Sequence, residues 1–280
     1  MSFEENNVLT IKTVQISPFR KLITALKDIL IETNVTFQPD GIRIINMDKS
    51  HTILVHMHLE ANKFQEYECK KDKIIIGMNM VYFFKLINTM ENDDILTMYI
   101  ENSNYEDGVV KFLGLKFENS KQCQCKTTCF KLMEPEQEEL VVPDIKFSSI
   151  INFPSDDFQK IIRDSSCISP NIEISSIGNQ LIIKCHGQFA VQEIVRTETD
   201  EVDDDDDNAG MHFISEKNST KIVQGLFSLK NLGYFTKCTN LCPQIELYLE
   251  NDLPLVVKYN VPDLGYIKLG TAAIEPMDNF

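Results

Sequence analysis

The stretch KLMEPEQEELVVPDIK, from Lys131 to Lys146, decides the fold because it separates two halves that read as copies of one unit. It holds four glutamates, two prolines (Pro135 and Pro143) and no glycine. Proline lacks the N–H that a helix interior or a central strand needs, so the stretch predicts a stiff, extended connector. Its residues from Leu132 to Asp144 can span roughly 43 Å at about 3.3 Å per residue, enough to cross the face of a domain.

The two halves share a series of features in the same order. Each half has an early helix-like segment, 17–28 and 154–164, and a later one, 80–91 and 228–240. Each later segment is followed by a strand with a shared ending, Tyr-Ile-Glu-Asn102 and Tyr-Leu-Glu-Asn251. Helix–strand–helix order also recurs by chance, but this agreement indicates an internal duplication.

The duplication predicts an α+β protein with two similar domains. We expect an N-terminal domain at 1–130, a connecting linker at 131–146 and a C-terminal domain at 147–280. A chain of 280 residues with 43% apolar content is long enough to bury two cores.

Composition and the N-terminal sequence indicate the cellular compartment of the protein. No window approaches a membrane span and the N-terminus MSFEENN is no signal peptide, so we expect a soluble protein with no membrane partner. Eight cysteines without an even framework indicate reduced thiols in an intracellular compartment.

Basic residues concentrate in the candidate helices, although the whole chain has a net charge of −15. Segments 17–28, 80–91, 155–168 and 228–240 carry eight Lys and Arg against five Asp and Glu, a balance of +3. The remainder carries 19 against 37, a balance of −18. Such a surface attracts a polyanion on one face and repels it elsewhere, which indicates contact with nucleic acid through the helices.

The first candidate helix has Ser17 as its predicted N-cap and Pro18 as its first helical residue. Apolar residues at helical spacing predict a buried stripe, which consists of Phe19, Leu22, Ile23, Leu26, Ile29 and Leu30. Arg20, Thr24 and Lys27 fall on the opposite face, with Lys21 at its edge. In the second half, Ser155 and Ser228 are the predicted caps, and the outward-facing basic residues are Lys160, Arg163, Lys230 and Lys237.

Metal-site signals are weak. Cys123, Cys125 and Cys129 form a C-x-C-x3-C cluster without a second knuckle, so small apolar residues on a strand are the better interpretation. His56 and His58 share one face of a strand but have no carboxylate or cysteine at fitting spacing. The aspartate run in Glu198–Asn208 predicts a mobile loop, which would not preorganise a metal.

Motifs for catalysis are missing from the sequence. It contains no glycine-rich phosphate loop, no G-x-S-x-G, no H-E-x-x-H and no paired cysteine knuckles. We therefore expect no enzyme, no cofactor and no metal. A metal-dependent enzyme built on the cysteine cluster or the aspartate run is the alternative from that class.

Several stretches resemble the proliferating cell nuclear antigen family, the eukaryotic-type DNA sliding clamps. They are Ala25–Asp28 (ALKD), Asn46–His51 (NMDKSH), Lys131–Met133 (KLM), Phe158–Asp164, Tyr234–Lys237 (YFTK), Leu253–Tyr259 (LPLVVKY) and Asp263–Gly265 (DLG). They cover nearly the whole chain in order, and the turn and LPLVV are the specific motifs. Abundant Asn, Ile and Lys suggest an AT-rich genome and a divergent, viral member.

The resemblance implies the DNA clamp fold and a homotrimeric ring whose helices line a hole for double-stranded DNA. DNA would be held without sequence readout, through contacts to phosphate. The positions that match the family's DNA-contacting residues are Arg20, Lys21, Lys27, Lys85, Lys160, Arg163, Lys230 and Lys237. One basic position of the family corresponds to Asn88.

The resemblance also implies a pocket for a short partner peptide with a glutamine, an aliphatic residue and two aromatics. The matching positions are Met47, His51, Leu54, Leu140, Val142, Pro254 and Ala272. Gly270 replaces a family aromatic residue, which affects pocket shape, and the family's modified lysine falls at or near Gly178.

By resemblance, the protein is a processivity factor for a DNA polymerase. Its other partners would be a clamp loader and further replication and DNA repair proteins with a clamp-interacting peptide. It would act in the nucleus, or at a cytoplasmic viral replication site if it is viral. The alternative is a clamp-fold scaffold, monomeric or part of a heterotrimer, that binds peptides without encircling DNA. The strands that would pair between subunits lie near Thr127–Met133 and Val191–Glu198.

Overall fold

The structure is a computed structural model, and it describes residues 6–106, 108–119, 121–135, 140–143, 145–199, 210–214 and 222–274. The chain divides into two compact units: residues 1–48, 55–142 and 261–267 in the first, and 49–54, 143–260 and 268–280 in the second. Of the predicted acidic loop Glu198–Asn208, only Glu198 and Thr199 are among the described residues.

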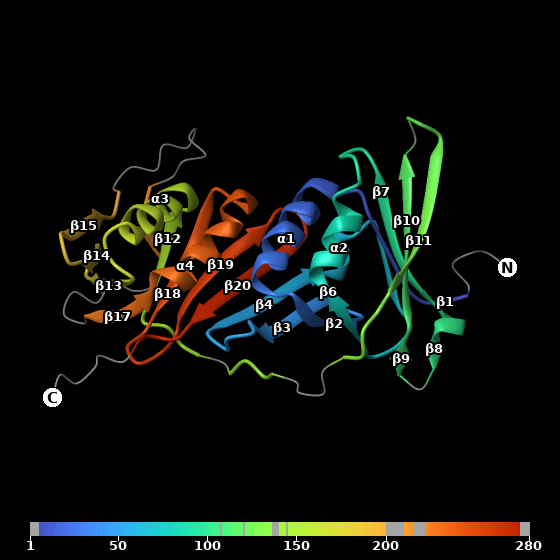
Figure 1. Cartoon of the computed structure of the whole chain (residues 1–280), viewed down its shortest axis with the longest axis horizontal. Helices are drawn as coiled ribbons and strands as arrows, with labels where there is room; N and C mark the ends of the chain where they lie inside the picture. Colours follow the sequence, from blue (N-terminus) through green and yellow to red (C-terminus); the bar gives the residue numbers. More distant parts are fainter. Residues whose placement is uncertain are drawn as a thin grey trace. The chain divides into compact units, whose positions relative to one another are not determined.

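Two helices, two larger sheets and the two-stranded sheet β8-β9 build the described part of the first unit (Figure 1). The helices are α1 (Ile16–Ile29) and α2 (Met80–Ile87), with 3-10 turns at Ala61–Lys63 and Asn102–Asn104. The first six strands are β1 (Asn7–Thr13), β2 (Glu32–Gln38), β3 (Gly41–Met47), β4 (Ile53–Glu60), β5 (Glu66–Cys69) and β6 (Ile74–Asn79). The others are β7 (Ile95–Glu101), β8 (Tyr105–Glu106), β9 (Val109–Val110), β10 (Phe112–Asn119) and β11 (Gln124–Lys131).

The second unit is made from the same kinds of element. Its helices are α3 (Ser155–Ser166) and α4 (Leu229–Phe235), and α4 runs into the 3-10 helix η3 (Thr236–Leu241). Its first strands are β12 (Ser149–Pro154), β13 (Asn171–Ile177), β14 (Gln180–His186), β15 (Val191–Thr197) and β16 (His212–Phe213). The later strands are β17 (Val223–Ser228), β18 (Gln244–Leu249), β19 (Leu255–Val261) and β20 (Gly265–Thr271). Of β20, residues Lys268–Thr271 belong to this unit.

Strand order repeats between the units. The first unit contains the order β11-β10-β7-β1-β5, and the second contains β20-β19-β18-β12-β16. The second sheets also correspond, as β4-β3-β2-β6 and β15-β14-β13-β17. Neighbours such as β10 and β11, or β13 and β14, pair antiparallel. The predicted α+β class with two topologically similar units of antiparallel sheets is confirmed.

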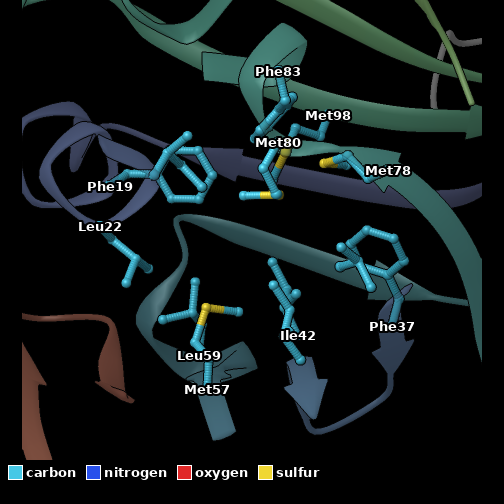
Figure 2. Close-up of a pocket in the computed structure, with 13 residues that line it drawn as sticks. Phe19, Leu22, Phe37, Ile42, Met57, Leu59, Met78, Met80, Phe83 and Met98 are labelled. Carbon is cyan, nitrogen blue, oxygen red and sulfur yellow. The ribbon is translucent and has the colours of Figure 1, made fainter. Parts of the chain in front are cut away.

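The core of the first unit lies between its helices and sheets. The predicted stripe of α1 is buried, with Leu22 and Leu26 fully inaccessible. Figure 2 shows side chains from α1, α2 and the strands, such as Phe19, Phe83 and Met57, surrounding a small apolar cavity. The cavity has a volume of about 30 Å³, so this core is close-packed around one small void.

The second unit buries its helices in the same way. Phe158, Ile161 and Ile162 of α3 are at most 6% exposed, and Leu232 and Phe235 of α4 are fully buried. The buried stripes of α1, α3 and α4 therefore pack into the cores of their units, and their polar residues meet solvent.

The predicted caps Ser17 and Ser155 are wrong. The residue that caps α1 is Gln15, whose carbonyl accepts the Phe19 N–H at 3.2 Å, and the cap of α3 is Pro154. Both serines lie inside the first turn, because α1 begins at Ile16 and α3 begins at Ser155 itself; each of these first residues is 1% exposed. The serine hydroxyl of Ser155 donates to the Cys242 carbonyl instead of capping α3.

Two helices are shorter than the sequence predicts. The second ends at Ile87 rather than at 91, and the fourth is α-helical only over Leu229–Phe235. Lys237 therefore lies on η3 and not on the same α-helix as Lys230. The strands that were not predicted are β2, β6, β8, β12, β16 and β17, because their positions depend on the sheets that they join.

Candidate nucleic-acid and peptide interfaces

The first unit carries its four predicted DNA-contact residues on neighbouring helices. Arg20, Lys21 and Lys27 lie on α1 and Lys85 lies on α2. The helices pack side by side, with Phe19 and Phe83 in edge-to-face contact at 6.4 Å between ring centroids (Figure 1). Lys21 and Lys85 are exposed, and Arg20 and Lys27 are half-buried. The structure therefore brings these basic residues onto the outer side of one helix pair.

Arg20 is held by the loop that follows α2. Its Nη1 donates to the Met90 carbonyl at 2.6 Å, and its Nη2 donates to the Asn92 Oδ1. The guanidinium thus ties α1 to this loop while keeping its positive charge. Arg20 has a structural role beside the predicted contact to phosphate.

Lys27 and Lys85 lie over aromatic rings of α2. The Lys27 Nζ is 4.9 Å from the ring centroid of Phe84, and the Lys85 Nζ is 5.3 Å from that of Tyr82. Both distances are within the range of a cation–π attraction. Lys27 also pairs with the Asp28 Oδ1 at 2.6 Å.

The second unit places Lys160 and Arg163 on α3, Lys230 on α4 and Lys237 on η3, and all four are exposed. The Gln159 side chain of α3 donates to the Thr236 carbonyl of η3 at 3.2 Å, which ties the two helical segments together. These four predicted residues are therefore solvent-accessible on adjoining helical segments.

One ion pair recurs in both units. Lys27 pairs with Asp28 near the end of α1, and Arg163 pairs with Asp164 at 3.1 Å near the end of α3. Ion pairs that solvent can reach are weak and screened by salt. The repeat reproduces at residue level the duplication seen in strand order.

Tyr82 and Phe84 are surface residues that the sequence reading missed. The run Tyr82-Phe83-Phe84 contained the signal, since residues of a helix are about 100° apart and only one of three can face the core. Phe83 takes the buried position with 2% exposure, and Tyr82 is left 58% exposed.

The predicted peptide-site residues divide between the units. In the first, Met47 and Val142 are half-buried and Leu140 is 36% exposed, next to Val141 at 87%. In the second, His51 and Ala272 are exposed, and Leu54 and Pro254 are half-buried. All seven side chains are at least partly accessible to solvent.

Two of these residues line a groove within the second unit. Pro254 and Ala272 both border this open depression of about 880 Å³, which also touches β17 and the turn at Asn251–Leu253. The Ile274 N–H donates to the Leu226 carbonyl at 2.7 Å and holds the chain after β20 beside β17. An extended partner segment has room here.

Gly270 is buried in β20, and an added Cβ would meet only ordinary contacts, with Leu54 at 3.7 Å and Val256 at 3.8 Å. A small side chain at this position would therefore fit without displacing its neighbours. Gly178 lies in the turn between β13 and β14 with φ of +60°, a conformation that favours glycine over lysine.

Metal and membrane features are few in the part of the chain that the structure describes. Within those ranges, no group of three or more His, Cys, Asp or Glu residues is placed to hold a metal ion. Cys125 and Cys129 lie on β11, as predicted for a strand, but Cys123 lies in the preceding turn and all three are exposed rather than apolar core. No helix in these ranges has the length and apolar character needed to cross a membrane.

The comparisons with known proteins agree along the chain. Residues 8–139 match the N-terminal domain of proliferating cell nuclear antigen, and residues 141–274 match its C-terminal domain. A protein of Paramecium bursaria Chlorella virus 1, named a probable DNA polymerase sliding clamp 1, is 30% identical over 276 residues, which cover 97% of this chain and 98% of the relative. The chain belongs to the proliferating cell nuclear antigen family of DNA sliding clamps.

Proposed function

We propose that this protein is a DNA sliding clamp, a processivity factor that keeps a DNA polymerase on its template. The main support is the set of eight basic residues on the helices of both units, in a chain whose net charge is −15. Such a distribution directs a polyanion to the helices and away from the remaining surface. The viral relative carries the same functional name. Sliding clamps act by binding and tethering, and we assign this chain no catalytic reaction.

Contact with duplex DNA would be electrostatic and independent of sequence. Lysine and arginine bind phosphate oxygens, which carry no base identity, and their affinity falls with salt. The residues proposed for this role are Arg20, Lys21, Lys27, Lys85, Lys160, Arg163, Lys230 and Lys237. Their weak ion pairs with Asp28 and Asp164 would exchange easily with passing phosphates.

Partner proteins would bind as short peptides. The proposed residues are Met47, His51, Leu54, Leu140, Val142, Pro254 and Ala272, and their accessibility supports this role. Partners would include the polymerase, a clamp loader and repair proteins, at a replication site in the nucleus or in a viral cytoplasmic compartment. The linker proposed at 131–146, between domains at 1–130 and 147–280, would supply Leu140 and Val142.

We propose a homotrimeric ring in which β11 of one subunit pairs with β15 of the next. Each is the terminal strand of its sheet, so one edge remains available among the described residues. Val191 and Val195 of β15 are 67% and 46% exposed, as expected for residues that a partner covers.

The test is charge reversal on the helices. Lys21, Lys27, Lys160 and Lys237 are changed together to Glu, and Arg20 is kept because it holds the loop after α2. We expect loss of duplex DNA binding at low salt and of stimulation of the polymerase from the same source, with an unchanged thermal melting curve.

The matched control reverses four exposed lysines outside α1 to α4 and η3, namely Lys63, Lys71, Lys73 and Lys111. This control changes the net charge of the protein by the same amount but leaves the proposed DNA-binding residues in place. It should therefore retain most of the DNA binding and of the polymerase stimulation. Equal losses in both variants would contradict the helix surface as the DNA site. A protein that stayed monomeric and bound partner peptides without DNA would instead be the clamp-fold scaffold.

A further inference from the structure

Helix α2 presents more aromatic surface than its packing requires. Phe83 is buried and contacts Phe19 and Phe130, at 6.4 and 5.9 Å between ring centroids. Its neighbours do not share that position: Phe84 is half-buried and Tyr82 is 58% exposed. Core packing therefore explains why an aromatic residue occupies position 83, but it does not explain the exposed parts of the Tyr82 and Phe84 rings.

Both flanking rings lie under lysines. The Tyr82 ring is 5.3 Å from the Lys85 Nζ, one helical turn along α2. The Phe84 ring is 4.9 Å from the Lys27 Nζ, which comes from α1. Two of the four basic residues proposed to contact DNA in this unit thus rest on rings of the same helix.

A ring holds an ammonium group differently from a carboxylate. The attraction comes from the quadrupole of the ring, which has no net charge, so the pair as a whole keeps a charge of +1. Asp164, by contrast, offsets the charge of Arg163 at 3.1 Å. A lysine on a ring remains attractive to phosphate while its flexible stem is restrained, which lowers the entropy that binding must remove.

We propose that Tyr82 and Phe84 are positioning residues that hold Lys85 and Lys27 ready for the phosphates of duplex DNA. The proposal rests on the DNA-binding function proposed above. Tyr82 and Lys85 are the clearer pair to test, because Lys27 also contacts Asp28.

The experiment is a double-mutant cycle on the full chain, with a short duplex DNA as the probe and fluorescence anisotropy over a low-salt series as the readout. Tyr82→Leu removes the ring, Tyr82→Phe keeps it and removes the hydroxyl, and Lys85→Ala removes the ammonium. We expect Tyr82→Leu to weaken binding about two- to fivefold and Tyr82→Phe to bind as the parent does.

Two measurements distinguish a positioning role of Tyr82 from a merely structural one: the coupling between Tyr82 and Lys85, and the salt dependence of DNA binding. In the Lys85→Ala background, Tyr82→Leu should have no further effect. Lys85→Ala should reduce the slope of log affinity against log salt by about 1, whereas Tyr82→Leu should leave it unchanged because no charge is lost. Phe189→Leu is the matched control, since Phe189 is 78% exposed and lies outside the helices; its affinity should not change.

Three results would overturn the proposal. The first is an affinity for DNA that Tyr82→Leu leaves unchanged. The second is an equal loss of affinity on Tyr82→Leu with and without Lys85, which would mean that the ring touches DNA itself. The third is a loss of affinity in Phe189→Leu as large as that in Tyr82→Leu. If Lys85→Ala weakened binding while Tyr82→Leu did not, only this inference would fail. If neither Lys85→Ala nor the charge reversal weakened binding, the proposed DNA surface would fail with it.

Discussion

Tyr259 is the residue where burial and hydrogen bonding conflict most clearly. It lies on β19, is fully buried, and its hydroxyl has no hydrogen-bond partner among the described residues. Burial raises the pKa of Tyr259 well above its ordinary value, and the neighbouring thiols of Cys238 and Cys242 act in the same direction. An unsatisfied buried hydroxyl costs about 1–3 kcal/mol.

Tyr259→Phe should therefore stabilise the protein, by about 1 kcal/mol, because it removes the hydroxyl and keeps the packed ring. The measurement is the urea midpoint with an unchanged slope. Tyr248→Phe is the matched control, since the Tyr248 hydroxyl donates to Glu246 and its removal should destabilise slightly. A lower midpoint for Tyr259→Phe would mean that the hydroxyl has a partner in solution.

At the scale of elements, the short helix α2 depends on its cap. It has only eight residues, and the Asn79 Oδ1 accepts the Tyr82 N–H at 3.1 Å. Ser228 precedes α4 in the corresponding position but makes no side-chain capping hydrogen bond. The duplicated helices thus share a place in the fold and differ in how their first turn is satisfied.

Asn79→Ala should lower the free energy of unfolding by about 1 kcal/mol, the usual cost of losing a side-chain cap. Ser228→Ala should change it by much less. Thermal and urea unfolding of both variants would check the difference, with Asn79→Asp expected to restore stability because aspartate also caps. Equal effects at the two positions would show that the hydrogen bond of Asn79 adds nothing.

At the scale of the whole molecule, the outer edge of β11 is the subunit contact that the proposed ring would use. The Leu132 N–H donates to the Lys111 carbonyl at 3.0 Å, and β10 and β11 pair in continuous register. Because antiparallel pairing alternates, residues at odd positions such as Thr127 direct their N–H away from β10. Proline at such a position keeps the internal ladder and blocks the outer edge.

Thr127→Pro should reduce the mass in solution from three times 32.1 kDa to a single chain, measured by light scattering over a dilution series. Thr127→Ala changes the side chain and keeps the N–H, so it should remain trimeric. A Thr127→Pro variant that kept the trimeric mass would exclude β11 as a subunit interface. A parent protein that was monomeric at every concentration would exclude the ring.

The sequence by itself determined what depends on neighbours along the chain. The buried stripe of α1 and the exposed basic residues Lys21, Lys160 and Lys230 follow from helical spacing, which is a local property. The sequence also predicted that His56 and His58 share one face of a strand; both are half-buried in β4, whereas Val55 and Met57 on the other face are buried. The duplication was recognisable because both units repeat their segments in one order.

Only the tertiary structure decided what depends on residues far apart. The contact of Arg20 with Met90 and that of Lys27 with Phe84 join different helices and loops, and no local period predicts them. The start of α1 at Ile16 and the strand β2 (Glu32–Gln38) likewise depend on burial against partners distant in the chain. Sequence periodicity reports which side of an element is apolar, whereas the identity of a contact is set by the packing of elements that meet only on folding.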